Sequence, residues 1–160
     1  MKTYDKATLE NLIDGNLAWP ELQGIISSEK DSDRFEKILE ILQNRVKFKE
    51  KILLPLSEHL YIVQKDGERI IKCDCGHEFG DYRENWKTSS RVILRDTKEK
   101  LDELYPSLMH ANPDWSELRE FYCPGCFTLL ENECVPPGYP VIHDFVPDLD
   151  AFYGKWVSKK

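Results

Sequence analysis

The sequence lacks any apolar run close to the roughly 20 residues that a membrane-spanning helix requires, so we expect no membrane partner. Its first residues, Met1 to Asp5, lack the apolar stretch of a secretory signal, and we expect a cytoplasmic protein. Basic residues are in the minority, because 22 Lys and Arg face 29 Asp and Glu and give a net charge of −7. Proteins that bind nucleic acid usually present a basic surface to phosphate groups. We therefore expect no nucleic-acid partner.

Familiar catalytic motifs are absent as well. The chain has no Gly-rich phosphate-binding loop of the P-loop or dinucleotide type, and no Gly-x-Ser-x-Gly nucleophile motif. The pair His143-Asp144 is similar to ligands of metal-dependent phosphohydrolases, but with only four histidines in the chain no second pair is available, so we expect a packed or hydrogen-bonded histidine. Lys87, Arg91 and Arg95 form a small basic cluster, which we interpret as a solvated or salt-bridged face. We expect no catalytic residue in this chain.

Helical patterns occupy the first 50 residues. We predict helices over residues 3–14, 20–27 and 31–45. The third prediction rests on an apolar stripe with helical spacing, formed by Phe35, Ile38, Leu39, Leu42 and Val46. This face indicates packing on a core or on a partner.

Strand patterns follow, and the Asp66-Gly67 pair predicts a tight hairpin turn between two of them. We predict strands over residues 60–63, 69–72 and 89–94, a helix over 97–105, and either a strand or a short helix followed by a strand over 115–122. The C-terminal region begins with a Pro- and Gly-rich segment and then carries Phe145, Phe152, Tyr153 and Trp156. A tail so rich in aromatic side chains is expected to cover a surface.

Four of the five cysteines form two close pairs that are far apart in the sequence, Cys73 with Cys75 and Cys123 with Cys126. Four thiolates form a common closed ligand set for structural zinc. Glycines in both turns permit the tight backbone that brings paired thiolates together, and both pairs follow predicted strands. The sequence therefore predicts one structural Zn²⁺ ion bound by these four cysteines.

Alternatives to this ligand set concern the neighbouring residues. His77 could replace Cys75 as a ligand, or support the site by a hydrogen bond. Cys123 and Cys126 could form a redox dithiol, although the residues after them indicate a turn and a strand where a thioredoxin-like site needs a helix. We expect Cys134 to be a small buried or partly buried residue outside the ligand set. The alternative function is that of a zinc-ribbon protein that binds nucleic acid or acts as an adaptor.

These patterns predict an α+β fold with a small zinc-ribbon-like antiparallel β core, N-terminal helices and extended terminal arms. We divide the chain into a helical N-terminal arm (1–50), a zinc-stapled β core with an inserted helix (51–135) and an aromatic C-terminal arm (136–160).

Longer motifs add a specific resemblance. They are Ile52-Leu53-Leu54-Pro55-Leu56, Cys73-Asp74-Cys75-Gly76-His77-Glu78-Phe79, Asn85-Trp86-Lys87, Arg91-Val92, Arg95-Asp96-Thr97, Tyr105-Pro106-Ser107-Leu108-Met109, Arg119-Glu120-Phe121-Tyr122-Cys123-Pro124, Tyr139-Pro140-Val141-Ile142-His143-Asp144-Phe145 and Pro147-Asp148-Leu149-Asp150-Ala151-Phe152-Tyr153. With them the chain resembles, nearly from end to end, the gamma subunit family of acetone carboxylase. Phe127 departs from the family pattern, which usually has glycine after the last cysteine.

The resemblance implies a role inside a larger enzyme. Such carboxylases use ATP to join acetone to bicarbonate-derived carbon and give acetoacetate. The resemblance implies that the ATP and Mn²⁺ chemistry belongs to two large subunits, alpha- and beta-like, with two copies of each subunit in the complex. This chain is then expected to be a non-catalytic, zinc-stapled subunit that joins them. The identity of the ketone is left open.

Overall fold

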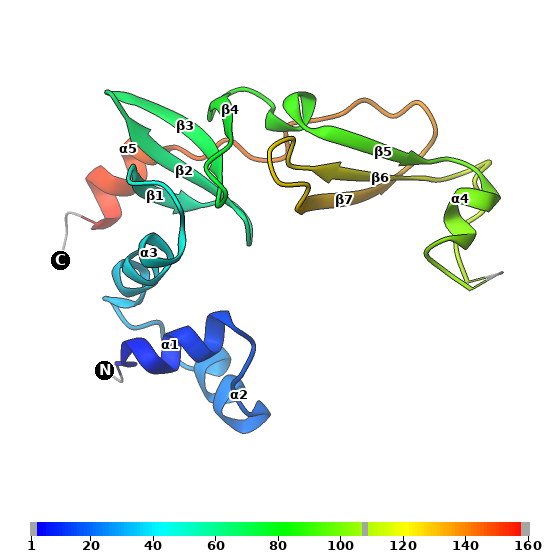
Figure 1. Ribbon diagram of the computed structural model, residues 1–160. Helices are drawn as coiled ribbons and strands as arrows, with labels where there is room; N and C mark the ends of the chain where they lie inside the picture. Colours follow the sequence, from blue (N-terminus) through cyan, green and yellow to red (C-terminus); the bar gives the residue numbers. More distant parts are fainter. Residues whose placement is uncertain (1–2, 107–108, 158–160) are drawn as a thin grey trace.

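The computed structural model describes residues 3–106 and 109–157, and within them the chain forms a helical bundle and two antiparallel sheets (Figure 1). The helices are α1 (Lys6–Ile13), α2 (Trp19–Ser27), α3 (Arg34–Arg45), η1 (Trp86–Ser89), α4 (Lys98–Asp102), α5 (Leu149–Ala151) and η2 (Phe152–Val157). The strands are β1 (Lys51–Pro55), β2 (Leu60–Lys65), β3 (Glu68–Cys73), β4 (Glu78–Asp81), β5 (Arg91–Arg95), β6 (Glu117–Tyr122) and β7 (Leu129–Val135). These antiparallel sheets with a few helices confirm the predicted α+β class. No helix in the described part of the chain combines the length and apolarity needed to cross a membrane.

The N-terminal helices have a small core of their own. Asp5 caps α1 by accepting a hydrogen bond from the Thr8 backbone N–H at 2.8 Å. Apolar side chains of α1, α2 and α3 then meet around the fully buried Leu9. The third helix begins at Arg34, three residues later than predicted, because residues 31–33 form a turn in which the Asp31 carboxylate binds the Arg34 side chain.

The first sheet has the order β1-β2-β3-β4, with every pair antiparallel. Asp66 and Gly67 both have positive φ angles, 48° and 89°, as the predicted two-residue hairpin turn requires. One face of this sheet packs under α3, where Tyr61 and Val63 meet Leu39 and Leu42. The apolar stripe of α3 therefore covers a sheet of its own chain. The sequence patterns missed β1 and β4, the two edges of this sheet.

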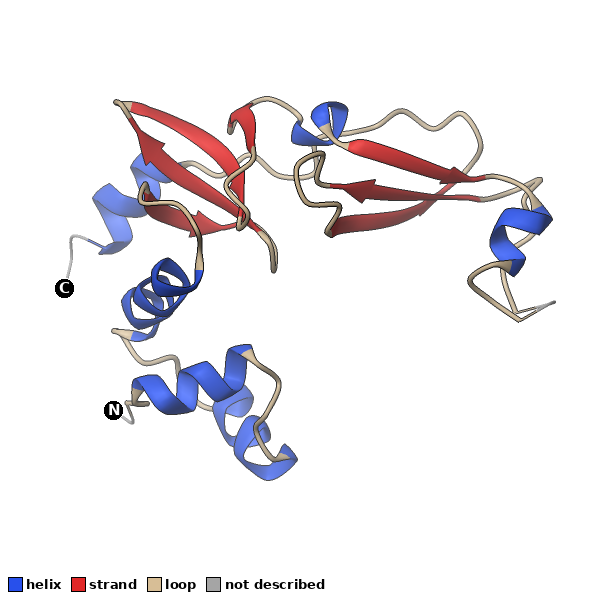
Figure 2. Cartoon of the chain, in the orientation of Figure 1, coloured by secondary structure: helices blue, strands red, loops and turns tan. Residues whose placement is uncertain are grey.

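The second sheet has the order β5-β6-β7 and is again antiparallel (Figure 2). The predicted strand at 89–94 is β5, preceded by the short helix η1. The predicted helix at 97–105 is reduced to α4, and the segment at 115–122 is the strand β6.

A single apolar cluster joins the two sheets. The Trp86 ring stands between Phe79 of the first sheet and Phe121 of the second, with ring centroids at 5.8 and 6.2 Å and edge-on geometry. Large aromatic surfaces of this kind dominate the energy of small cores. The relative position of the sheets is therefore fixed in part by one side chain from the segment between them.

The C-terminal segment crosses back from the second sheet to the first (Figure 1). Leu149 is buried in the cluster between the sheets, and the Tyr153 hydroxyl donates a hydrogen bond to the Leu53 carbonyl at 2.6 Å. Phe152 packs edge-on against Phe35 at 5.1 Å. Much of the predicted aromatic arm thus covers its own chain, while Phe145 is exposed. The Trp156 side chain and residues 158–160 lie outside what the structure describes.

Candidate metal centre

The first cysteine pair lies on the turn between β3 and β4. Cys73 is the last residue of β3, and its backbone N–H donates to the His77 carbonyl at 2.9 Å. The Gly76 N–H donates to the Cys73 carbonyl at 2.8 Å, and Gly76 has a φ of 98°, which a residue with a side chain rarely adopts. This tight turn directs the Cys73 and Cys75 thiols to the same side.

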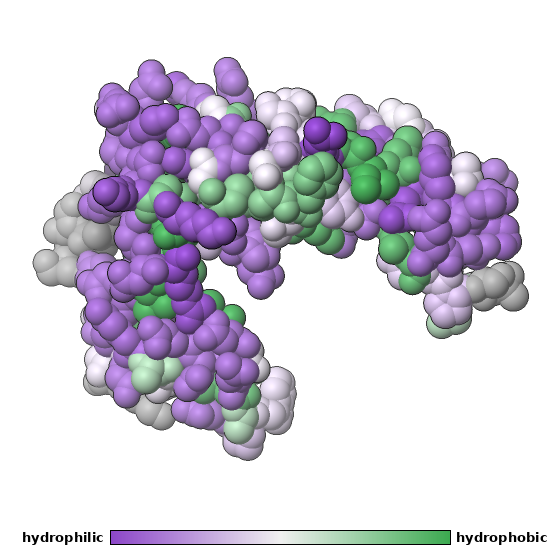
Figure 3. Space-filling model, viewed as in Figure 1, coloured by the Kyte–Doolittle hydropathy of each residue, from purple (hydrophilic) through white to green (hydrophobic). Residues whose placement is uncertain are grey.

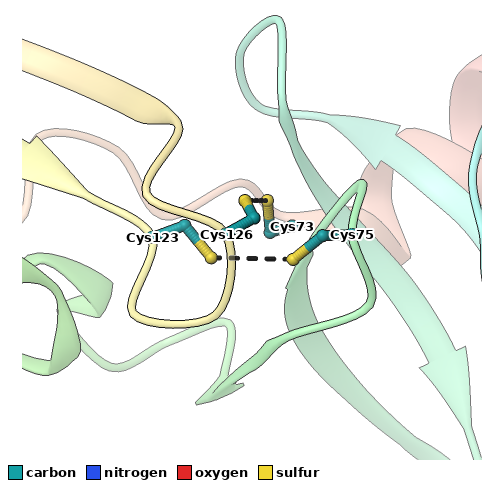
Figure 4. Close-up of side chains that lie close together, drawn as sticks. All are labelled: Cys73, Cys75, Cys123 and Cys126. Carbon is teal, nitrogen blue, oxygen red and sulfur yellow. Dashed lines mark hydrogen bonds between the residues drawn. The ribbon is translucent and has the colours of Figure 1, made fainter.

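The second pair lies on a similar turn between β6 and β7. The Cys123 N–H donates to the Thr128 carbonyl, and the Phe127 N–H donates to the Cys123 carbonyl, each at 2.9 Å. Phe127 has a φ of 59°, in the left-handed region that favours glycine. The departure from the glycine pattern therefore falls on a position where the backbone is strained. Each sheet thus presents one two-cysteine turn to the other (Figure 4).

The four sulfur atoms come together with a metal-like spacing. All four Sγ atoms lie within 4.8 Å of one another. The Cys73 and Cys126 sulfurs are 3.7 Å apart, and so are those of Cys75 and Cys123. Four sulfurs at about 2.3 Å from a tetrahedral Zn²⁺ ion would be about 3.8 Å apart. The set could hold a metal ion.

Burial makes the thiols in the interior hard to ionise. It raises the pKa of the Cys73 thiol and also that of the Cys123 thiol. Burial opposes ionisation of Cys126 as well, but hydrogen bonds from the side chain and backbone of Thr128, and from neighbouring thiols, outweigh it and lower its pKa to about 7. A divalent cation would reverse this balance, because a coordinated thiol loses its proton. Full ionisation of the cluster therefore requires a cation at its centre.

His77, the predicted alternative ligand, lies outside this cluster. The His77 ring packs edge-on against Phe79 at 5.0 Å, and a side chain at Gly125 would meet the His77 Cβ at 3.1 Å. His77 thus fills the space beside the second turn. Within residues 3–106 and 109–157, the group of potential ligands contains the four cysteines and no histidine. Two sulfur–sulfur distances of 3.7 Å join one turn to the other. The second turn leads into β7, which does not match a redox dithiol at a helix start.

Our expectation that Cys134 is buried or partly buried was wrong. Cys134 lies on β7 with an exposed side chain, because β7 is an edge strand of a three-stranded sheet and few side chains cover it there. Its sulfur is 2.7 Å from the Ser116 hydroxyl and lies outside the cysteine cluster.

A hydrogen bond behind the first turn was missed by the sequence reasoning. The Asp74 carboxylate, between the first two cysteines, is 2.8 Å from Nδ1 of His59. The Asp74 N–H also donates to the His59 carbonyl at 3.1 Å. The supporting histidine of this turn is therefore His59, from the segment before β2. Only the pairing of that segment with the end of β3 brings it near.

A buried ionic cluster was also missed. Lys87 is fully buried, and its ammonium group contacts the carboxylates of Glu131 at 2.7 Å, Glu133 at 3.6 Å and Asp144. The ammonium also lies 5.3 Å from the centre of the Phe121 ring. Burial opposes the charge, but hydrogen bonds to Asp144 and Glu131 outweigh it and raise the pKa of Lys87. The cluster fixes the C-terminal segment to the second sheet and leaves His143 beside it.

The other two members of the predicted basic cluster have separate partners. Arg95 is bound to Glu103 and Glu120, at 2.7 and 2.6 Å. The Arg91 guanidinium lies over the Phe127 ring at 5.0 Å. The prediction of a salt-bridged face is confirmed for Arg95. Lys87 also forms salt bridges, but it does so in the interior.

Two β-hairpin turns that converge four cysteines on one point define a zinc-ribbon-like protein with a potential metal centre between two sheets. Comparison with known families is more specific. Residues 46–157 match the family model described as acetone carboxylase gamma subunit. The chain is 44% identical over 157 residues to the acetone carboxylase gamma subunit of Xanthobacter autotrophicus (strain ATCC BAA-1158 / Py2), which covers 97% of this chain and 94% of that protein. The chain belongs to the acetone carboxylase gamma subunit family.

A second relative is named for another ketone. The chain is 32% identical over 113 residues to the acetophenone carboxylase beta subunit of Aromatoleum aromaticum (strain DSM 19018 / LMG 30748 / EbN1). The alignment covers 69% of this chain and 80% of that protein. Both relatives are carboxylase subunits by name.

Proposed function

We propose that this chain is a small, zinc-containing and non-catalytic subunit of an ATP-dependent ketone carboxylase, and that it joins the large catalytic subunits in the cytoplasm. The observation that carries the proposal is the 44% identity to an acetone carboxylase gamma subunit over 97% of the chain. Acetone and bicarbonate are the proposed substrates and acetoacetate the product, because the acetophenone-related protein is less similar and aligns with less of the chain.

Zinc is the proposed metal, with Cys73, Cys75, Cys123 and Cys126 as ligands. Soft thiolates and a tetrahedral spacing are typical of structural zinc. Four thiolates would leave no open position for a water molecule or a substrate, so the ion would serve as a crosslink between the two sheets. We therefore assign ATP and Mn²⁺ to the large alpha- and beta-like subunits, in a complex with two copies of each chain.

A scaffolding role also agrees with the distribution of apolar side chains. Large apolar residues are exposed on β5, near the second cysteine turn and along the C-terminal segment, including Ile93, Phe127 and Phe145. Exposed apolar groups spread over several elements are typical of a chain that contacts large partners.

Co-expression of this chain with the two large subunits tests the proposal. We expect the three chains to purify together and to fix labelled bicarbonate into acetoacetate with acetone and ATP, and we expect no fixation when this chain is omitted. Fixation by the two large subunits alone, at the rate of the full complex, would contradict the proposal.

A further inference from the structure

The strand β5 is an edge of the second sheet whose outer side is unpaired in the described part of the chain. Proteins usually blunt sheet edges with bulges, prolines, charged residues or covering elements. Within the described residues, β1 has a register shift and ends at Pro55. Its edge is also covered, because the Gln43 side chain accepts from the Ile52 N–H at 2.9 Å and Tyr153 donates to the Leu53 carbonyl. The strand β4 has only four residues and a register shift.

The remaining edge, β7, is interrupted by a register shift near its start. In contrast, β5 pairs with β6 over its whole length without any shift. Among the backbone hydrogen bonds of residues 3–106 and 109–157, those of β5 go only to β6. The outer backbone groups of β5 are therefore free to pair with another strand.

Both faces of β5 are apolar and exposed. The side chains of Val92, Ile93 and Leu94 are 48%, 45% and 36% exposed. Since successive side chains of a strand point to opposite faces, a new strand beside β5 would cover apolar groups on both sides. Figure 3 shows the corresponding green area over β5 on a face that is largely purple and white. Backbone pairing and apolar burial together are the basis of strand addition.

Charge favours a different chain over a second copy of this one. If two copies paired antiparallel about Ile93, Arg91 of each would face Arg95 of the other, whose two carboxylate partners are already engaged, so a second copy would supply no carboxylate directly opposite Arg91. Arg95 already holds Glu103 and Glu120, whereas Arg91 has no carboxylate partner in the described part of the chain. The complementary partner strand therefore has apolar residues at its centre and a carboxylate opposite Arg91.

Phe127 marks one end of this edge. Its ring lies against Arg91, the first residue of β5, and is 60% exposed. Glycine would adopt the left-handed backbone of this position without strain. An exposed ring kept in a strained conformation contributes little to the folded chain by itself, and residues in such conformations concentrate at functional sites. The ring is well placed to contact whatever segment pairs with β5.

We propose that an extended segment of a large carboxylase subunit pairs with β5 as a fourth strand of the second sheet, with a carboxylate at Arg91 and an apolar side chain at Phe127. This inference rests on the proposed function, because it takes the large subunits as the partner. It adds the surface and the mode of contact.

A matched pair of variants tests the edge in the co-expressed complex. Ile93→Lys places a charge in the proposed interface, and Ile26→Lys places the same charge at an exposed isoleucine of α2. We expect Ile93→Lys to weaken recovery of the large subunits about tenfold or more, because a desolvated, unpaired charge is costly. We expect Ile26→Lys to leave recovery near that of the wild type. Thermal unfolding of both variants controls for loss of fold.

Phe127→Gly separates docking from stability. This variant is expected to keep the thermal midpoint of the free chain near that of the wild type, because the relief of strain offsets the loss of the contact with Arg91, and to weaken assembly about threefold or more, because the exposed ring is lost. A change that merely destabilised the core would lower both the thermal midpoint and the assembly with the large subunits. Amide hydrogen exchange adds a backbone measurement, since β5 amides should exchange at least about tenfold more slowly in the complex than in the free chain.

Each result has a distinct meaning. Equal assembly of Ile93→Lys and wild type, or β5 amides that exchange equally fast in complex and free chain, would overturn the docking edge while leaving the proposed function intact. A chain that dimerises alone through β5, with Ile93→Lys giving monomers, would show that the occupant is a second copy and would also overturn the proposal. A wild-type chain that never purifies with the large subunits would overturn the proposed function itself.

Discussion

Replacement of Cys126 by serine isolates the contribution of the metal crosslink. Cys126 is exposed, so the small change from sulfur to oxygen disturbs little packing. Cys75 and Cys123 are 48 positions apart, and chain-entropy arguments give about 4 kcal/mol for a crosslink that closes a loop of this length. We therefore expect Cys126→Ser to lose the tightly bound zinc and up to about 4 kcal/mol of stability. For a chain of this size that corresponds to a fall of about 8–16 °C in the unfolding midpoint.

Metal analysis and thermal unfolding of the full chain, each with and without a chelator, form the assay. Wild type should carry one zinc ion per chain and should unfold at a lower temperature when chelator is present. Cys126→Ser should unfold near that lower temperature and respond little to the chelator. Cys134→Ser is the matched control, because Cys134 is also an exposed cysteine but lies outside the cluster, and its stability should change by less than about 0.5 kcal/mol.

Two results would refute the reasoning. One is a wild-type chain that holds no metal after purification in zinc-containing medium. The other is a Cys126→Ser chain that retains both its metal and its wild-type midpoint. Either result would mean that the spacing of the sulfurs does not reflect coordination.

Three further predictions concern one buried aromatic side chain and two ion pairs. Trp86→Ala should lower the free energy of unfolding by about 3–5 kcal/mol, measured by denaturant titration, because it empties the space between the two sheets. Lys87→Met should cost about 3–5 kcal/mol and speed proteolytic removal of the C-terminal segment, because carboxylates are left without their cation; equal proteolysis rates would contradict this. The hydrogen bond from Lys72 lowers the pKa of Glu50 below its ordinary 4.5, so this pair stabilises the fold above pH 4.5 and the effect is lost as the pH falls through the lowered value. The difference in urea midpoint between wild type and Lys72→Met should accordingly shrink below about pH 4.5, and a constant difference from pH 7 to pH 3 would count against it.

Local chemistry explains which features could be predicted from the sequence. The turn at Asp66-Gly67 needs two residues that tolerate positive φ angles, and these two meet that need without help from the rest of the chain. The convergence of Cys73 and Cys126 was also predictable, because close cysteine pairs on tight turns suit a shared ion. Helix existence followed from apolar spacing in the same way, while the start of α3 did not, because a side-chain bond within the preceding turn decided it.

Features that depend on residues far apart in the sequence could not be predicted from it. Lys87 was predicted to belong to a solvated or salt-bridged basic face. Its burial could not be predicted, because Glu131 and Asp144 become its neighbours only when β7 and the C-terminal segment lie beside it. His59 reaches Asp74 only after β2 and β3 pair. The existence of two sheets was likewise hidden, since alternation of side chains identifies strands and does not say which strands pair.

The return of the C-terminal segment to the first sheet has a consequence for synthesis. Tyr153 bonds to Leu53 across 100 positions, and Leu149 fills part of the core between the sheets. The three N-terminal helices can close their own small core early, as soon as they leave the ribosome. The sheets gain their last contacts only after nearly the whole chain has been made, and such distant contacts form slowly. A nascent chain therefore passes through a stage with a folded N-terminus and open sheets, and it is in this stage that the cysteine turns are most accessible to an incoming metal ion.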